Sequence, residues 1–269
     1  MKNWTLKGLV AGKATTRWPG SGNNDGQDGV LGMPIFDPKQ CSPGCRECVQ
    51  VCPTKAFSIG KNHLHEESVS LDYGRCVNCQ ICVESCPTEA LQSSPNLLFA
   101  TRSKSDLVCS DYESEPEVDE LQSRISSMFK GSLHVRHVDA GSCNGCESEL
   151  GALNNPFYNL HRLGIFFTPS PRFADVLLVT GPIVPQMKDP LLRAWEAMPR
   201  PRFVLAAGTC PIYGAPFDFG YSGGYGLNDL LPVDVFVPGC PPTPAAFIHG
   251  LLLLTDRIGQ KVHGGRYEP

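Results

Sequence analysis

The sequence predicts an α+β domain in the N-terminal half and an α/β domain with a parallel sheet in the C-terminal half. One observation is a cysteine motif that occurs twice between residues 39 and 105. A second is the acidic run that follows it, typical of a linker. The third is the alternation of apolar runs and helix-like segments after residue 131, which is typical of parallel strands covered on both faces.

Composition limits the function classes. The chain has 269 residues, with 23 Lys and Arg against 27 Asp and Glu, so we expect about two domains and no nucleic-acid partner. The first residues lack the pattern of a signal peptide, and no apolar run approaches the roughly 20 residues of a membrane span. We therefore predict a cytoplasmic chain, in which 13 reduced cysteines indicate metal or redox chemistry before disulfides.

The chain divides into four predicted segments. Residues 1–38 form an N-terminal extension that carries four basic residues before its first acid, and it is either a flexible tail or a docking arm for a partner or a membrane surface. Residues 39–105 form the cysteine-rich domain. Residues 106–130 form an acidic linker, with a short helix expected over 121–129, and residues 131–269 form the last domain.

The last segment is predicted to be an α/β flavodoxin-like parallel-sheet domain. Its apolar runs predict five strands, at 134–138, 164–168, 175–180, 202–207 and 233–237. Helical patterns between them predict helices at 147–163, 189–197 and 244–258.

The second copy of the cysteine motif runs from Cys76 to Pro87 with the spacing C-x2-C-x2-C-x3-C-P. This is the spacing of bacterial ferredoxins, in which the fourth cysteine ligates the cluster of the other motif. Three thiolates within seven residues can wrap one [4Fe–4S] cluster, while the fourth lies one helical turn further on. The N-terminal half is therefore predicted to be an α+β ferredoxin-like two-cluster domain.

Crosswise ligation assigns eight cysteines to two clusters. The predicted ligands are Cys41, Cys45, Cys48 and Cys86 for cluster 1, and Cys76, Cys79, Cys82 and Cys52 for cluster 2. The first copy has one extra residue after Cys41, so we expect the loop 42–44 to bulge, and a [3Fe–4S] cluster stays an alternative there. Zinc is a further alternative, although zinc sites usually pair C-x2-C units across a longer spacer.

Four more cysteines follow predicted strands. Cys143 and Cys146 follow the strand at 134–138, Cys210 follows the strand at 202–207, and Cys240 follows the strand at 233–237. Ligands of open parallel sheets bind beyond the carboxyl ends of the strands, so we predict a third [4Fe–4S] cluster here. Buried unreactive cysteines are the alternative. Cys109 remains unassigned, and we interpret it as an incidental thiol of the linker.

With both motifs in view, the N-terminal half resembles the two-cluster ferredoxin subunits of formate hydrogenlyase and of complex I. This resemblance covers roughly residues 1–108 and includes the lead-in at 7–15. It implies that the domain passes electrons through its clusters.

The C-terminal half resembles the small subunit of group 4 energy-conserving [NiFe] hydrogenases of the hydrogenase-3/hydrogenase-4 type, a relative of the complex I 20 kDa subunit. The resemblance covers roughly residues 131–258 and rests on segments 143–149, 170–175, 180–182 and 232–244. It implies that the four matching cysteines hold the proximal cluster beside the Ni–Fe site. The C-x2-C spacing of the first pair is the hydrogenase form. Segment 210–214 departs from both families, which usually have small residues and glycines there.

A few other residues carry weaker signals. The resemblance implies that Glu149 tunes the third cluster or takes part in proton transfer, and a helix-start carboxylate is the alternative. His134 and His137 show no partner pattern and are interpreted as ordinary. No phosphate-binding loop, dinucleotide fingerprint or nickel-ligating pair occurs, so we expect no catalytic residue and no NAD, FMN or nickel in this chain.

The sequence thus predicts an electron-transfer subunit of a membrane-associated [NiFe] hydrogenase complex. Its expected partners are the hydrogenase large subunit or its complex I homologue, membrane-arm subunits, and a formate dehydrogenase, ferredoxin or carbon monoxide dehydrogenase. Partner subunits would hold it at the inner face of the cytoplasmic membrane. The alternatives are a subunit of a complex I-like NADH/ferredoxin-quinone oxidoreductase, a stand-alone redox carrier or sensor, and, more remotely, a structural zinc protein.

Overall fold

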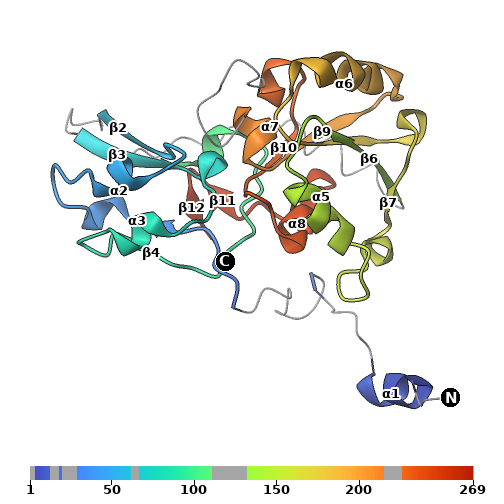
Figure 1. The fold of residues 1–269 in the computed structure, drawn as a ribbon, viewed down its shortest axis with the longest axis horizontal. Coiled ribbons are helices and arrows are strands. Elements are labelled where there is room, and N and C mark those ends of the chain that lie inside the picture. The colour runs from blue at the N-terminus through green and yellow to red at the C-terminus, as the bar shows by residue number, and fades with distance from the viewer. Residues whose placement is uncertain are drawn as a thin grey trace.

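The structure is a computed structural model that describes residues 4–12, 18–19, 29–61, 67–110, 132–214 and 226–268. Figure 1 shows the N-terminal elements on one side and the parallel sheet on the other, with the C-terminal hairpin between them. The helix predicted at 121–129 lies outside the described residues. None of the described helices is long and apolar enough to cross a membrane.

The N-terminal domain is α+β, as predicted. Antiparallel strands form a three-stranded sheet in the order β2-β3-β5 and a two-stranded sheet of β1 and β4. The elements are β1 (Ile35–Phe36), α2 (Glu47–Val51), β2 (Phe57–Lys61), β3 (Glu67–Asp72), α3 (Ile81–Glu84), β4 (Leu91–Gln92) and β5 (Val108–Cys109).

The sequence repeat is also a structural repeat. A 3-10 helix precedes each motif, η1 (Pro38–Gln40) in the first copy and η2 (Tyr73–Arg75) in the second. Asp37 caps the first by accepting a hydrogen bond from a backbone N–H two residues on, and Asp72 caps the second in the same way. Each 3-10 helix leads directly into a cysteine, and a short α-helix follows. Both copies therefore present their cysteines from the same local framework.

The C-terminal domain is built on a five-stranded parallel sheet in the order β10-β9-β8-β6-β7. Numbered along this domain, the strand order is 2-1-3-4-5, one of the two common orders of doubly wound α/β sheets. The strands are β6 (Leu133–Asp139), β7 (Ile165–Phe167), β8 (Val176–Thr180), β9 (Phe203–Ala207) and β10 (Val235–Val237). The helices are α5 (Gly145–Ala152), α6 (Pro185–Ala197), α7 (Thr209–Tyr213) and α8 (Pro244–Leu254).

Two predicted helices are shorter than expected, and the one predicted at 244–258 ends at Leu254. The sequence pattern predicted a helix over 147–163, but α5 ends at Ala152 and only the 3-10 helix η4 (Leu160–Leu163) follows. Pro156 disfavours helical geometry in the residue before it. The side chain of Asn155 then accepts a hydrogen bond from the Tyr158 backbone N–H, which stabilises a turn in place of helix.

The two domains share an apolar core. Leu177 and Val204, on one face of the parallel sheet, belong to the same buried cluster as Leu71, Phe99 and Leu107 of the N-terminal half. The other face of the sheet packs on α8 in a second cluster, which also contains Trp18 of the N-terminal extension. The domains are therefore packed against each other along the sheet.

Residues 99–109 connect the domains through polar contacts as well. Thr101 pairs with Phe236 of β10 by two backbone hydrogen bonds of 2.8 and 3.0 Å. Arg102 forms an ion pair with Asp256 at 3.1 Å. The segment 106–110, which the sequence placed in the linker, contributes β5 to the N-terminal sheet.

The C-terminal hairpin returns to the N-terminal domain. It consists of β11 (Val262–His263) and β12 (Arg266–Tyr267), and the ring of Tyr267 stacks on Phe99 at 5.3 Å. Gly265 has a φ of +71°, and an added Cβ would lie 2.2 Å from the backbone N of Cys109. Cys109 is fully buried here, so its surroundings are those of a core residue rather than of an exposed linker thiol.

Two helical glycines give a matched test of the packing of α8 against the parallel sheet. An added Cβ at Gly250 of α8 would lie 2.4 Å from Val237, whereas nothing lies within 4 Å of one at Gly151 of α5. Gly250→Ala should therefore lower the free energy of unfolding by about 1–3 kcal/mol. Gly151→Ala should raise it by about 0.5–1 kcal/mol. Chemical denaturation of both variants checks this, and equal stabilities would contradict the described packing of α8.

Candidate functional site

The second motif brings its cysteines together with one from the first. Burial, and then the nearby thiols of Cys82, Cys79 and Cys52, raise the pKa of Cys76 to about 12. Burial, followed by Cys79 and Cys52, also raises the pKa of Cys82 to about 11. These four cysteines are the set that crosswise ligation predicts for cluster 2.

The first motif gathers in the same manner. Burial, followed by the thiols of Cys41 and Cys45, raises the pKa of Cys48 to about 12. Cys82 of the second motif adds to this shift, so the two cysteine sets are neighbours. Helices α2 and α3, which follow the two loops, are packed together.

The fourth cysteine of each motif lies in a Cys-Pro-Thr turn. The backbone N–H of Ala56 donates to the sulfur of Cys52 at 3.3 Å, and this sulfur lies 3.5 Å from the hydroxyl of Thr54. At the equivalent Cys86, burial acts to raise the pKa, but backbone N–H groups led by that of Thr88 lower it overall. Hydrogen bonds of this kind favour the thiolate, the form that binds iron.

The extra residue of the first motif is absorbed in a tight turn. The backbone N–H of Cys45 donates to the carbonyl of Ser42 at 3.1 Å. Pro43 and Gly44 occupy the central positions, and Gly44 has a φ of +77°, which is the pattern of a type II turn. The expected bulge at 42–44 is confirmed in this form.

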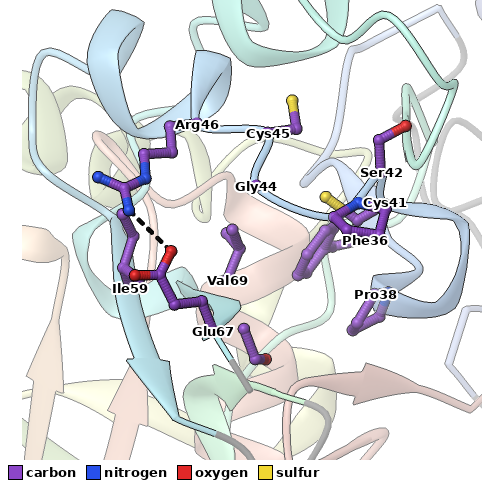
Figure 2. A pocket seen from close by; sticks show the side chains of 12 residues that line it. Phe36, Pro38, Cys41, Ser42, Gly44, Cys45, Arg46, Ile59, Glu67 and Val69 are labelled. Atoms are coloured by element: carbon purple, nitrogen blue, oxygen red, sulfur yellow. Dashed lines mark hydrogen bonds and ion pairs between the residues drawn. The ribbon is translucent and has the colours of Figure 1, made fainter.

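A pocket of about 390 Å³ lies beside this turn (Figure 2). Its rim includes an ion pair between Arg46 and Glu67 at 2.7 Å. The sulfur of Cys45 points away from the pocket. The pocket is therefore not the space that the Cys45 thiol faces.

The third set of cysteines meets at the carboxyl edge of the parallel sheet. The pKa of Cys146 is raised, mainly by burial. The charge of Glu147 and then the three other thiols of the set add to this shift. Burial, followed by Cys240 and Cys143, raises the pKa of Cys210 to about 12. The loops after β6, β9 and β10 thus place Cys143, Cys146, Cys210 and Cys240 together, as the topology argument expected.

Glycine allows the chain to pass close to these sulfurs. Gly208 has a φ of +100°, and an added Cβ would lie 3.2 Å from the sulfur of Cys146. At Gly145 an added Cβ would lie 3.5 Å from the sulfur of Cys143. Backbone this close to a sulfur can donate N–H hydrogen bonds, which tune cluster potentials.

Within the described ranges, no three His, Cys, Asp or Glu side chains are placed to hold a single metal ion. A cubane differs from such an ion because each of its four thiolates binds a different iron atom. The three gathered sets of cysteines and the N–H donors to sulfur are the features that suit such clusters.

Sequence reasoning missed a polar network beside Cys146. The carboxylate of Glu147 accepts hydrogen bonds from the hydroxyls of Ser142, at 2.7 Å, and of Thr180. The hydroxyl of Thr180 also lies 2.8 Å from Nε2 of His137. Burial lowers the pKa of His137 below its usual value, which favours the neutral ring.

His137 is therefore not an ordinary residue, because its ring on β6 contacts Thr180 of β8 and lies 3.6 Å from the carboxylate of Glu147 in α5. The only sequence signal for Glu147 was its position directly after Cys146. Glu149, which the sequence nominated instead, lies outside this network, and burial raises the pKa of its carboxyl. Its role in the cluster site stays a prediction.

Comparison with known proteins agrees with the two halves of the chain. Residues 143–254 match the family model described as "NADH ubiquinone oxidoreductase, 20 Kd subunit", and residues 38–90 match a "4Fe-4S dicluster domain". The probable membrane-bound hydrogenase subunit mbhJ of Pyrococcus furiosus is 41% identical over 147 residues, which are 54% of this chain and 88% of that protein. The chain belongs to the 20 Kd subunit family of NADH ubiquinone oxidoreductase.

Two further proteins are similar to part of this chain. Formate hydrogenlyase subunit 7 of Escherichia coli (strain K12) is 41% identical over 143 residues, so the match spans 53% of this chain and only 56% of that protein. A chain in the structure of the membrane-bound sulfane sulfur reductase, an archaeal respiratory membrane complex, is 32% identical with a TM-score of 0.41. That match covers 55% of this chain and 80% of the other.

The polar network predicts that removing the hydroxyl of one buried threonine lowers the stability of the fold more than removing that of another. Thr180→Val removes a hydroxyl that contacts both Glu147 and His137, so it should lower the free energy of unfolding by about 1–3 kcal/mol. Thr255→Val is the matched control, because that hydroxyl donates only to carbonyls of its own helix. Denaturant titration of both variants tests this. A Thr180 variant no less stable than the Thr255 variant would count against the network.

Proposed function

We propose that this chain holds three [4Fe–4S] clusters, each bound by one of the three sets of four cysteines. The observation that carries the proposal is the gathering of these thiols in separate places from distant parts of the chain. Crosswise ligation is supported by the proximity of Cys52 to Cys76 and Cys82. Ligation of cluster 1 by Cys86 rests on the repeat, because Cys86 occupies the same Cys-Pro-Thr turn as Cys52.

Such clusters would supply one-electron oxidation and reduction. The chain itself provides thiolates, burial and backbone N–H groups, which together set the reduction potentials. Backbone N–H groups lower the pKa of Cys86, which favours its thiolate form, and the Ala56 N–H donates to the sulfur of Cys52. The Glu147 network fixes the loop of Cys143 and Cys146 against β8, because Glu147 contacts both Ser142 and Thr180.

At the level of the whole assembly, the chain acts as the non-catalytic electron-transfer subunit of a membrane-associated [NiFe] hydrogenase complex. Membership of the family, together with relatives named as a hydrogenase subunit and a formate hydrogenlyase subunit, supports this. Electrons would pass between the Ni–Fe site of a large subunit and a redox partner. The partner classes are a formate dehydrogenase, a ferredoxin or a carbon monoxide dehydrogenase, and membrane-arm subunits would hold the chain at the cytoplasmic face.

A second candidate is the equivalent subunit of a complex I-like quinone reductase. The observation that favours it is the family model itself, whose description names an NADH ubiquinone oxidoreductase. The C-x2-C spacing of Cys143 and Cys146 favours the hydrogenase assignment instead. Quinone reduction by the isolated complex, without hydrogenase activity, would favour the second candidate.

Iron content of double variants tests the crosswise ligation. Three clusters predict about 12 iron atoms per chain. Cys52→Ala combined with Cys76→Ala should remove one cluster and leave about 8. Cys86→Ala combined with Cys76→Ala should remove two and leave about 4. If each motif ligated its own cluster, the first pair would instead remove two clusters and the second pair one. Iron analysis of the anaerobically purified protein therefore distinguishes the two modes of ligation.

Cys109→Ala is the matched control for these variants. Cys109 is as buried as any ligand, but its sulfur faces the carbonyl of Phe36 at 3.8 Å rather than a cysteine set. We expect the variant to keep all of the iron, about 12 atoms per chain. A loss of about four atoms would show that the assignment of ligands is wrong.

Metal analysis of the complex purified through this chain tests the assembly. A hydrogenase complex predicts about 12 iron atoms from this chain, together with nickel from a co-purifying subunit. Iron at that level without nickel would favour the complex I-like candidate or a stand-alone carrier. Zinc in place of iron would contradict the electron-transfer proposal as a whole.

A further inference from the structure

The loops of the second and third cysteine sets touch each other. Thr209 precedes Cys210 in α7 and is buried, and its hydroxyl donates toward the backbone carbonyl of Cys76 at 3.3 Å. The same hydroxyl lies 3.3 Å from the carbonyl of Gly239, the residue before Cys240. The Thr209 side chain therefore connects the two sets: Thr209 adjoins Cys210, and its hydroxyl contacts the backbone of Cys76 and of the residue before Cys240.

Tyr213, at the end of α7, makes a second contact with the same part of the N-terminal domain. Its ring lies under the guanidinium of Arg75, with 4.0 Å from Cζ to the ring centroid. The ammonium of Lys104 lies 3.8 Å from that centroid. The phenol hydroxyl donates to the carboxylate of Asp72. The ring is thus held by two cations and one carboxylate from the other domain.

The backbone of η2 is shaped for this ring. An added Cβ at Gly74 would lie 2.8 Å from Cε2 of Tyr213, so a larger residue there would push the ring away. Lys104 also donates to the carbonyl of Ile212 at 3.1 Å. Asp72 therefore caps η2, which leads into Cys76, and at the same time binds the helix that carries Cys210.

We propose that Thr209 and Tyr213 are positioning residues that fix the separation between the Cys76 set and the Cys210 set. The inference rests on the proposed function. One electron would pass between the two clusters, oxidising one and reducing the other, with no bond formed or broken. Because the rate of such transfer falls steeply with distance, a clamp between the two ligand loops bears directly on it. It also accounts for a tyrosine in segment 210–214, where the resembling families usually have small residues.

The rest of the interface should survive loss of the clamp. The Thr101–Phe236 pairing, the Arg102–Asp256 ion pair and the shared apolar core hold the domains together elsewhere. Variants of Thr209 and Tyr213 are therefore expected to fold and to retain their iron.

Electron paramagnetic resonance of the reduced, anaerobically purified complex tests the proposal. Two neighbouring reduced clusters split each other's signals, and the splitting falls with the cube of their separation. Tyr213→Ala and Thr209→Val should each weaken or abolish the splitting between the Cys76-set and Cys210-set signals. Tyr213→Phe keeps the ring contacts with Arg75 and Lys104 but loses the hydrogen bond to Asp72, so we expect a smaller loss of splitting.

Asp256→Asn is the matched control. It breaks an ion pair of the same interface away from the cysteines, and its φ of +55° suits asparagine. This variant should show the splitting of the unaltered complex even if its unfolding temperature falls. A purely structural role for Tyr213 would lower the unfolding temperature in the same way without changing the splitting.

The remaining outcomes of the experiment also support or overturn the proposal. Unchanged splitting in both Tyr213→Ala and Thr209→Val would overturn the proposal, as would the absence of any splitting between these signals in the unaltered complex. If Tyr213→Ala does not fold, Thr209→Val and Tyr213→Phe carry the test with the same expectations. Failure of the proposed function is distinguished from this, because an unaltered chain without iron or cluster signals would show it directly.

Discussion

Four cysteines that are to bind one cluster must come from chain segments that end at the same place, and both halves of the chain gather cysteines in this way. In the N-terminal half, an Asp-capped 3-10 helix delivers the first cysteine of each motif, and a Cys-Pro-Thr turn delivers the last. In the C-terminal half, parallel strands deliver Cys143, Cys210 and Cys240 to one edge of the sheet. Two unrelated architectures thus solve the same convergence problem.

The two domains that carry the cysteine sets are also packed closely against each other. A single apolar core extends from the parallel sheet into the N-terminal domain. Segment 99–109 pairs with β10 and then returns to β3, while the C-terminal hairpin covers Cys109. This arrangement holds the two domains, and with them the loops that carry their cysteines, against each other.

The network around Glu147 shows how burial and charge are balanced at the third set. A largely buried carboxylate beside a group of thiols is costly unless its oxygens are hydrogen-bonded. Ser142 and Thr180 supply those bonds, and His137 contacts Thr180 with a ring whose pKa is lowered by burial. The same bonds tie the loop of Cys143 to β8, so electrostatic compensation and positional rigidity come from one set of contacts.

The sequence by itself determined which cysteines form the motifs, a bulge of the loop at 42–44 and the parallel sheet, because each depends on spacing along a short stretch of chain. It overextended the helix after Cys146 and treated Cys109 and His137 as incidental. Those residues acquire their surroundings from segments far away in sequence, which no local pattern encodes. Only the tertiary structure decided that the ring of Tyr213 contacts both Arg75 and Lys104, because these contacts depend on how two independently patterned domains pack together.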